Sequence, residues 1–575
     1  MKKILVLVSN NLILAACSVF VLAACSIQTS SNSNSQGFLG ALRPLSTSER
    51  AADFDQLLAL FNDYYGPYNF KEKTLGIKIN DLAASLKAKA ALAQTDEEFA
   101  GYVMQFGAAL KDGHVQIVIE NTATGVSKYS VPIILTPIEG RAIVGSVDAE
   151  LAKSFQISNG DEVLEVDGKG PFEFYLPIAL KYRSLARPES EQHYIIYSLY
   201  RPSYMTELKP TQNTVRVKLK KADGSLNTVD IPWQETKYNK DLDILLPNKG
   251  EFDLRVPFAN DFNDVVHSTI KQMGDVNPFF LTPPVQGTFN FVKVYPSDTA
   301  RKKFGLADKE TPPIYAALYR YQGKSILLVR QATYSPSDFS SEIYMKAYMA
   351  LLSEYEALAD VMVLDQTHNP GGSYCADFYN LFSRDQDVQS AELLHADRKW
   401  INDLKVNYVL QNPHPPIWDA LSLESWGLNV EHAYDAGQSL SAPVPLFTGS
   451  FFATKPAYRW SKPMLLLVDE LAGSCGDMFP MIVKANKRAQ IFGQRTMGLG
   501  GNVEEVGILN NSRLHVSLTR GMFYPYNPAR GPIDSDFIEN AGVTPDINYS
   551  HTVDDYRAGY VGYVKSFSDA AILQK

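Results

Sequence analysis

Apolar side chains recur along the chain with two different periods, and the period changes from one region to the next. From residue 46 to about 110 they recur every three or four positions, as at Phe54, Leu57 and Phe61, which predicts helices. Ser46 and Glu49 stand three residues apart at the start of this run, a spacing typical of a capping box. We therefore expect an N-terminal helical region over residues 46–120.

The last helix of this region leads to a corner that carries a histidine. The acidic stretch 95–98 predicts the helix start, and Gly113 favours a helix stop directly before His114. Residues 115–119 then have the composition of a strand. His114 is thus predicted at a helix-to-strand corner, from which a side chain can be directed into a site.

Residues 131–233 have the pattern of a small β-rich module. The clearest segment is 160–168, Gly-Asp-Glu-Val-Leu-Glu-Val-Asp-Gly, a strand followed by hairpin-type turn residues. Alternating apolar positions predict further strands at 215–219 and 229–232. The segment resembles that of a PDZ domain, here with an insertion around 182–208. The resemblance implies that extended peptide C-termini bind at a sheet edge.

The pattern changes to α/β after residue 312. Continuous apolar runs at 326–329, 361–364 and 464–468 predict strands buried on both faces. Stretches 341–356 and 477–487 have helical patterns. An α/β domain with parallel strands is therefore expected.

The remaining boundaries follow from where these patterns stop. We expect the α/β domain over 313–550, with a Trp-, Pro- and His-rich lid insertion at 385–460. Residues 234–312 are expected to be a connector with some local structure, and 551–575 a C-terminal segment.

The first residues have the pattern of a secretion signal. Lys2 and Lys3 precede a mostly apolar stretch that ends in Leu-Ala-Ala before Cys25, as in bacterial lipoprotein cleavage sites. A second such pattern ends at Cys17, but the Ser/Asn-rich residues that follow favour Cys25. We expect a signal peptide over 1–24, lipidation at Cys25 and a tether over 25–45. The protein would then be lipid-anchored in the bacterial cell envelope, on an outer membrane facing the periplasm or the cell surface.

Composition and charge narrow the remaining possibilities. With 575 residues, 45% hydrophobic and 20% charged, the chain is too long for one hydrophobic core. Its net charge of −9 and the lack of a dense basic run exclude nucleic acid as a partner. Neither His-Glu-x-x-His nor a paired Cys-x-x-Cys spacing occurs, so we expect no metal and no other cofactor.

Two corners at the ends of predicted strands carry chemistry. Residues 365–372 end in Asn-Pro-Gly-Gly, where Gly371 and Gly372 allow backbone N–H groups to face a cavity, as in an oxyanion hole. Residues 469–477 are a small-residue loop that places Ser474 at a helix N-terminus. Taken alone, the first corner is most simply a turn and Ser474 a helix cap. His368, beside the first corner, is interpreted as a turn residue.

Both corners belong to a longer series of motifs. In chain order these are Asp112-Gly113-His114, the PDZ-like segment, Asn369–Gly372, the Ser474 loop, Gly493-x-x-Thr-x-Gly498, and Glu539-Asn-x-Gly-Val-x-Pro-Asp546. The series resembles the tail-specific, or C-terminal-processing, serine peptidase family and its tricorn-type relatives. This resemblance implies a multidomain α+β protein: an N-terminal helical region, a PDZ-like β-rich module and a crotonase-like α/β catalytic domain.

The position of the general base separates two branches of that family. Leu499 stands where the bacterial processing proteases carry a Lys base, and an aliphatic side chain cannot accept a proton. The tricorn-type branch uses a His from the first motif and a Glu from the last, which correspond to His114 and Glu539. The resemblance thus implies Ser474 as nucleophile, His114 as general base and then acid, and Glu539 as the group that orients the imidazole.

Two details of this assignment stay open in the sequence. Tricorn has a Ser where this chain has Gly113, so Asp112 and Asp546 are alternative orienters of His114. The oxyanion would be bound by the N–H of Gly371 or Gly372 together with that of Cys475. If the family layout holds, Cys375 and Cys475 flank one cleft, and a disulfide between them is a hypothesis.

The sequence predicts a serine-type peptidase that cleaves extended peptides or protein C-termini. Two alternatives remain. The scaffold could bind an apolar ligand without catalysis, or present its PDZ-like module to a partner in the envelope.

Overall fold

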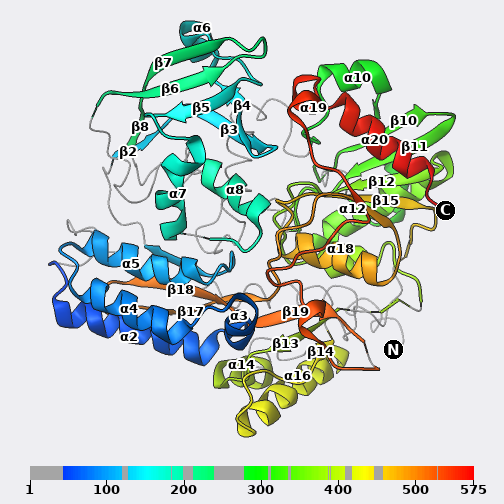
Figure 1. Cartoon of the computed structure of the whole chain (residues 1–575). Coiled ribbons are helices and arrows are strands. Elements are labelled where there is room, and N and C mark those ends of the chain that lie inside the picture. The colour runs from blue at the N-terminus through cyan, green and yellow to red at the C-terminus, as the bar shows by residue number, and fades with distance from the viewer. Residues whose placement is uncertain are drawn as a thin grey trace.

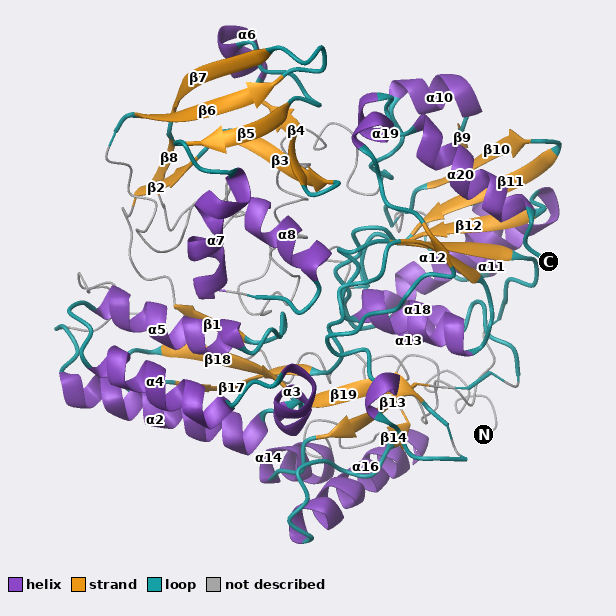
Figure 2. Cartoon of the chain, viewed as in Figure 1, coloured by secondary structure: helices purple, strands orange, loops and turns teal. Residues whose placement is uncertain are grey.

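The computed structural model describes residues 43–119, 127–182, 184–197, 212–237, 277–307, 312–334, 339–385, 387–388, 390–407, 417–445, 457–527 and 529–575. Within these ranges the chain forms a mixed α/β fold with several separate sheets (Figure 1, Figure 2). The expected signal peptide and Cys25 lie outside the described residues. In the part of the chain that is described, every helix is too short or too polar to cross a membrane.

Helices cover a small antiparallel sheet in the N-terminal region (Figure 1). The elements are α2 (Thr47–Tyr64), α3 (Tyr68–Leu75), α4 (Ile79–Ala91), α5 (Asp96–Ala109), β1 (Gln116–Ile119), β17 (Val503–Ile508) and β18 (Leu514–Thr519). The capping box predicted at Ser46 and Glu49 is present. Strand β1 pairs with β18, and Val516 and Leu518 share a buried core with Phe54 and Phe106. The N-terminal region is therefore built together with strands from the far end of the chain.

A five-stranded antiparallel sheet forms the β-rich module, in the order β3-β4-β5-β6-β7. Its elements are β3 (Ile133–Ile138), β4 (Arg141–Val147), α6 (Ala149–Phe155), β5 (Glu162–Val166), α7 (Pro171–Tyr182), α8 (Pro188–Tyr197), β6 (Thr214–Lys220) and β7 (Leu226–Pro232). Beside it, β2 (Ser127–Ser130) pairs with β8 (Gln234–Lys237). Asp167 and Gly168 both have positive φ, as the predicted hairpin turn after β5 requires. The identification of this module as PDZ-like stays a prediction.

A seven-stranded sheet, in the order β20-β16-β15-β12-β11-β10-β9, forms the α/β domain. Its strands are β9 (Val292–Lys293), β10 (Ala316–Tyr321), β11 (Lys324–Arg330), β12 (Val361–Asp365), β15 (Met464–Val468), β16 (Gln490–Gly493) and β20 (Ile547–Asn548). From β11 to β20 the strands run parallel, and β10 and β9 are antiparallel additions. All three apolar runs predicted as strands lie in this sheet. The crotonase-like description of the domain stays a prediction.

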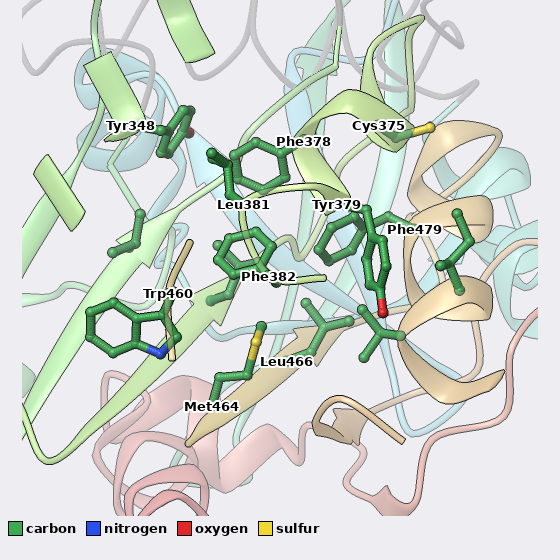
Figure 3. Close-up of a cluster of buried hydrophobic side chains, with 14 of the residues drawn as sticks. Tyr348, Cys375, Phe378, Tyr379, Leu381, Phe382, Trp460, Met464, Leu466 and Phe479 are labelled. Carbon is green, nitrogen blue, oxygen red and sulfur yellow. The ribbon is translucent and has the colours of Figure 1, made fainter. Parts of the chain in front are cut away.

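Each central strand contributes to two cores, one on either face. Met362 and Leu364 of β12 face a cluster with α12 (Ser341–Tyr355), α13 (Cys375–Tyr379) and α18 (Cys475–Ala485). Val361 and Val363 face the opposite cluster. This alternation is why the run is apolar throughout. Figure 3 shows part of the first cluster, where Phe378, Phe382 and Phe479 pack together and Cys375 lies at the edge.

Residues expected as a connector and as a C-terminal segment build the second face of the sheet. The local structure found within 277–307 is α10 (Pro283–Phe289), β9 and α11 (Asp298–Lys303). The C-terminal segment forms α19 (Val553–Arg557) and α20 (Val561–Ile572). Phe280 and Val285 pack there against Phe567 of α20, so these residues are part of the α/β core.

The expected lid region contributes a small sheet, β14-β13-β19. The elements of the region are β13 (Ser390–Leu394), α14 (Arg398–Asn402), η4 (Asp403–Asn407), α16 (Ile417–Asp435) and β14 (Val444–Pro445). The third strand of the sheet, β19 (Gly521–Pro525), comes from later in the chain. Two further single turns are η3 (Glu356–Leu358) and η5 (Asp534–Asp536). Because β19 follows β18 directly, this sheet is continuous in the chain with the N-terminal layer.

Candidate active site

Ser474 lies at the N-terminus of α18, directly after a tight loop that leaves β15. Its backbone has φ 56° and ψ −119°, a conformation that a residue with a side chain rarely adopts. Although it occupies the cap position, its side chain makes no capping hydrogen bond. The simpler interpretation of Ser474 as a helix cap is therefore wrong. Ser474 instead combines a half-buried side chain with backbone strain at a helix N-terminus, and strain of this kind clusters at functional sites.

The Asn-Pro-Gly-Gly corner after β12 packs directly against Ser474. A Cβ on Gly371 would lie 2.6 Å from the Ser474 Cβ and 2.8 Å from the Cys475 nitrogen. Gly371 also has φ 106°, a backbone conformation that favours glycine. Both the lack of space and this conformation therefore disfavour any larger residue at the position. Asn369 joins the corners, because its carbonyl oxygen accepts the Gly473 N–H (3.0 Å).

The hydrogen bonds at this corner separate the two glycines proposed for the oxyanion hole. The Gly371 N–H donates to Asn369 Oδ1 (2.9 Å), so it is already engaged within the corner. Gly372 is exposed. The N–H of Cys475 is the first of α18, one of the donors that a helix leaves without an internal acceptor. Gly372 and Cys475 are therefore the better pair of donors, and Gly371 provides space.

Cys375 and Cys475 form a disulfide, as the family layout suggested. Cys375 begins α13, three residues after Gly372, and Cys475 follows Ser474. The bond is buried, with Cys375 fully enclosed. It thus joins the helices that follow the two corners.

His114 lies between α5 and β1, buried in the corner predicted for it. Its backbone N–H donates to Asp112 Oδ1 (2.9 Å). The helix stop differs from expectation: α5 ends at Ala109, and Lys111 rather than Gly113 takes the left-handed conformation (φ 52°). Glycine is needed at position 113 for close packing, because a Cβ there would lie 2.7 Å from both Leu185 and Leu499.

Leu499 connects the His114 corner to the Ser474 loop. Its side chain lies against Gly113 on one side, and a Cβ on Gly473 would lie 3.1 Å from it on the other. The glycines next to His114 and next to Ser474 therefore flank one leucine, 98% buried. Leu499, expected from the resemblance to replace a Lys base, has a packing role here, and two corners that are distant in the sequence meet at its side chain.

Glu539 is fully buried, and both carboxylate oxygens have partners. Oε2 accepts the Gly500 N–H (2.8 Å), and Oε1 forms an ion pair with Lys71. Burial raises the pKa of Glu539, the nearby Asp112 carboxylate adds to this, and Lys71 opposes it.

The two alternative orienters of His114 both have further hydrogen-bond partners. Asp112 accepts hydrogen bonds from Tyr65 (2.9 Å) and Thr519 (2.8 Å) as well as from the His114 backbone, so it shapes the corner. Burial would raise the pKa of Asp112, but Lys71 and His114 outweigh it and lower that pKa. Asp546 is bound at β16 by the Ile491 N–H (2.9 Å) and by Lys484 (3.2 Å).

Sequence reasoning missed two buried charged residues at this site. Asp477, in the first turn of α18, accepts the N–H groups of Gly498 (2.9 Å) and Leu499 (2.8 Å), and burial raises its pKa to about 7. Lys71, in α3, pairs with Glu539. Asp477 stands beside the Ser474 loop and could have been flagged, whereas nothing in the local pattern around Lys71 indicates a buried cation.

The histidine beside the glycine corner, His368, contacts residues outside the proposed catalytic group. His368 pairs with Asp469, and its ring stacks on Phe279 with centroids 4.6 Å apart. Among the described residues no group of three or more His, Cys, Asp or Glu side chains is arranged to hold a metal ion.

Comparison with known proteins assigns this part of the chain. Residues 338–549, which contain Ser474 and the glycine corner, match the sequence profile described as Peptidase family S41. The chain carries a peptidase family S41 domain. The protein with this domain is accordingly a serine-type peptidase.

Similar proteins extend over almost the whole chain. A protein of Chlamydia trachomatis serovar D is 24% identical over 568 residues, which cover 89% of this chain and 90% of that protein. A protein of Chlamydia pneumoniae is 22% identical over 578 residues, covering 92% and 90%.

Solved structures show the same fold at low identity. The crystal structure of mature CPAF has a TM-score of 0.68 at 20% identity, covering 92% of this chain and 99% of that one. The structure of mature CPAF complexed with lactacystin has a TM-score of 0.67 at 19% identity, covering 91% and 98%. The N-terminal layer and the β-rich module of this chain are thus part of the shared fold.

Proposed function

We propose that the protein hydrolyses peptides through an acyl-enzyme on Ser474, with His114 as the general base. The observation that carries the proposal is the convergence at Leu499. Gly113, next to His114, and Gly473, next to Ser474, contact the Leu499 side chain from opposite sides. The backbone of Ser474 is strained, and its hydroxyl makes no capping hydrogen bond. An imidazole suits the task because its ordinary pKa of about 6.5 lies near neutral pH.

The chemistry follows from these positions. His114 takes the hydroxyl proton as Ser474 attacks the scissile carbonyl, and then gives it to the leaving amine. The Gly372 and Cys475 N–H groups bind the oxyanion, and each such donor contributes roughly 10²–10³ in rate. Glu539 stabilises the imidazolium that forms.

The decisive experiment uses a serine-directed fluorophosphonate and a peptide substrate. Ser474→Ala is expected to lose both the label and turnover, and peptide mapping should place the label on Ser474. Ser373→Ala, which removes an exposed hydroxyl from the neighbouring corner, serves as the control and should keep the label. His114→Ala should lower kcat/KM by roughly 10²–10⁴-fold. Peptidase activity retained by Ser474→Ala would refute the assignment.

We further propose that the β-rich module delivers substrates by their C-termini. Strand β3 is at the edge of its sheet and lies beside α8, so an extended peptide adding to that edge would run between the strand and the helix. Peptides with a free C-terminal carboxylate should then bind more tightly than the same peptides with a C-terminal amide. Equal binding of the carboxylate and amide forms would contradict a role of the module in recognising C-termini.

Anchoring of the chain by a lipid at Cys25 is proposed from the residues around it. Metabolic labelling with a radioactive fatty acid should mark the protein, and Cys25→Ala should abolish the label and release the protein from membranes. Cys17→Ala is the matched control. An unlabelled protein would exclude the lipid anchor. The proposed location in the cell envelope would then lose its support, because it rests on that anchor.

A further inference from the structure

One buried lysine of α3 lies among the groups proposed for catalysis, although no motif contains it. Lys71 is fully buried, whereas Lys73 of the same short helix is 70% exposed and pairs with Asp534 at the surface. Burying an ammonium group is costly unless its charge and its N–H groups are all matched. The contacts of the Lys71 ammonium group therefore indicate the role of this buried charge.

Each contact of the Lys71 ammonium leads to one of two motifs. It donates to Glu539 Oε1, to Asn540 Oδ1 (2.6 Å) and to the carbonyl oxygen of Lys111 (3.4 Å). Glu539 and Asn540 belong to the last motif of the chain, and Lys111 directly precedes the Asp112-Gly113-His114 corner. Three acceptors match the three protons of the group, so Lys71 serves as a cation here and not as a proton acceptor.

The local balance of charge makes this cation important. Asp112 and Glu539 are both fully buried or nearly so, and each raises the cost of ionising the other. Lys71 is the opposite charge that acts on both carboxylates. Without it, a buried Glu539 beside an ionised Asp112 would take up a proton and could not stabilise an imidazolium.

We propose that Lys71 is a positioning residue, which fixes the Glu539 carboxylate and the His114 corner in a single arrangement. The inference rests on the proposed function, since it assigns the role through His114 and Glu539. It also extends the catalytic machinery to α3, outside the residues 338–549 that match the peptidase family.

The pH dependence of activity is the readout that separates positioning from folding. Facing Glu539 are Lys71 from α3, Asp112 from the corner after α5 and Tyr65 from the end of α2, and His114 in turn acts on Asp112. Removing Lys71 leaves burial and Asp112 to raise the pKa of Glu539 without opposition. If the reaction needs ionised Glu539, kcat/KM falls as pH drops through that pKa. The acidic limb of the profile should therefore move to higher pH.

The experiment compares Lys71→Met with Lys73→Met, the same change two residues further along the helix, where the side chain is exposed. Lys71→Met should lower kcat at pH 7 at least tenfold, leave KM within threefold, and shift the acidic limb upward by about one pH unit. Lys73→Met should match the wild type, and Lys71→Arg should return the limb towards its original pH. In a Glu539→Gln background, Lys71→Met should cause no further shift. If Lys71→Met does not fold, as judged by circular dichroism, Lys71→Gln replaces it.

A second measurement is independent of turnover. Infrared difference titration of each Lys71 form against its Glu539→Gln counterpart reports the protonation of Glu539. The proposal expects the protonated carboxyl to persist to higher pH in Lys71→Met. An unchanged titration together with an unchanged pH profile would overturn it. A wild type that shows the expected titration but no fluorophosphonate labelling would instead refute the proposed function and leave the Lys71–Glu539 coupling standing.

Discussion

At the scale of single residues, the site depends on backbone conformations that side chains normally avoid. Ser474 has φ 56° although it carries a Cβ, and strain of this kind costs of the order of 1–3 kcal/mol. The neighbouring Gly371 makes room for it. The strain falls on the residue proposed as the nucleophile, and strained backbone of this kind clusters at active sites.

Gly371→Ala is expected to lose activity as well as stability. At φ 106° an alanine is strained by about 1–2 kcal/mol, and its Cβ would lie 2.6 Å from that of Ser474, which must shift. Gly224→Ala is the matched control, because Gly224 has φ 86° in a hairpin turn with open space around it. Both variants should unfold at lower denaturant concentration, but only Gly371→Ala should show a large fall in kcat. Full activity in Gly371→Ala would mean that the close contact has no role in placing Ser474.

At the scale of elements, the site is assembled where two parallel strands end. The corners after β12 and β15 meet because neighbouring parallel strands end at the same edge of the sheet. The two helices that follow, α13 and α18, are then joined by the Cys375–Cys475 disulfide, which closes a loop of 100 residues. The bond therefore restrains both proposed oxyanion donors.

Breaking the disulfide is expected to lower both stability and kcat. Loss of a bond that closes a long loop typically costs about 2–5 kcal/mol, and the Cys475 N–H would lose a restraint beside Ser474. Activity and denaturant midpoint are measured with and without reductant, and the Cys375→Ser/Cys475→Ser double variant should be insensitive to it. A thiol count of two on the unreduced protein, or equal activity in both states, would contradict this expectation.

At the scale of the whole molecule, the β-rich module contacts the loop that carries Ser474 through its helix α8. Ser190 of α8 donates to the Glu470 carbonyl oxygen (2.6 Å), and His193 lies 2.9 Å from Glu470 Oε1. Leu185, between α7 and α8, packs with Leu471 and Leu499 in one buried cluster. The module therefore contacts both the Ser474 loop and the side chain that separates it from His114.

His193→Ala is expected to lower kcat several-fold without unfolding the module. It removes the contact with Glu470, four residues before Ser474, while the module keeps its own core of β3 and β6 residues. Turnover of a short peptide is measured beside thermal unfolding, and His432→Ala, an exposed histidine on α16, is the control. Unchanged turnover would show that docking of α8 has no influence on the loop.

Much of the candidate site could be predicted from the sequence, because burial and backbone conformation both restrict which residue types occur in a local segment. The continuous apolar runs required strands covered on both faces, and the glycines and small residues after β12 and β15 marked the corners. His114 and Ser474 are candidates because the series of motifs resembles a peptidase family. Leu499 excluded a lysine base for a chemical reason that needs no coordinates.

Only the tertiary structure decided how the charged groups are paired. Lys71 and Glu539 are 468 positions apart, and neither the helix around Lys71 nor the motif around Glu539 specifies the partner. The same holds for the Gly371 N–H, whose engagement by Asn369 depends on the shape of the turn. Periodicity is a local property that one segment can carry. A buried ion pair exists only when packing removes water from two distant segments at once, so no stretch of the sequence contains it.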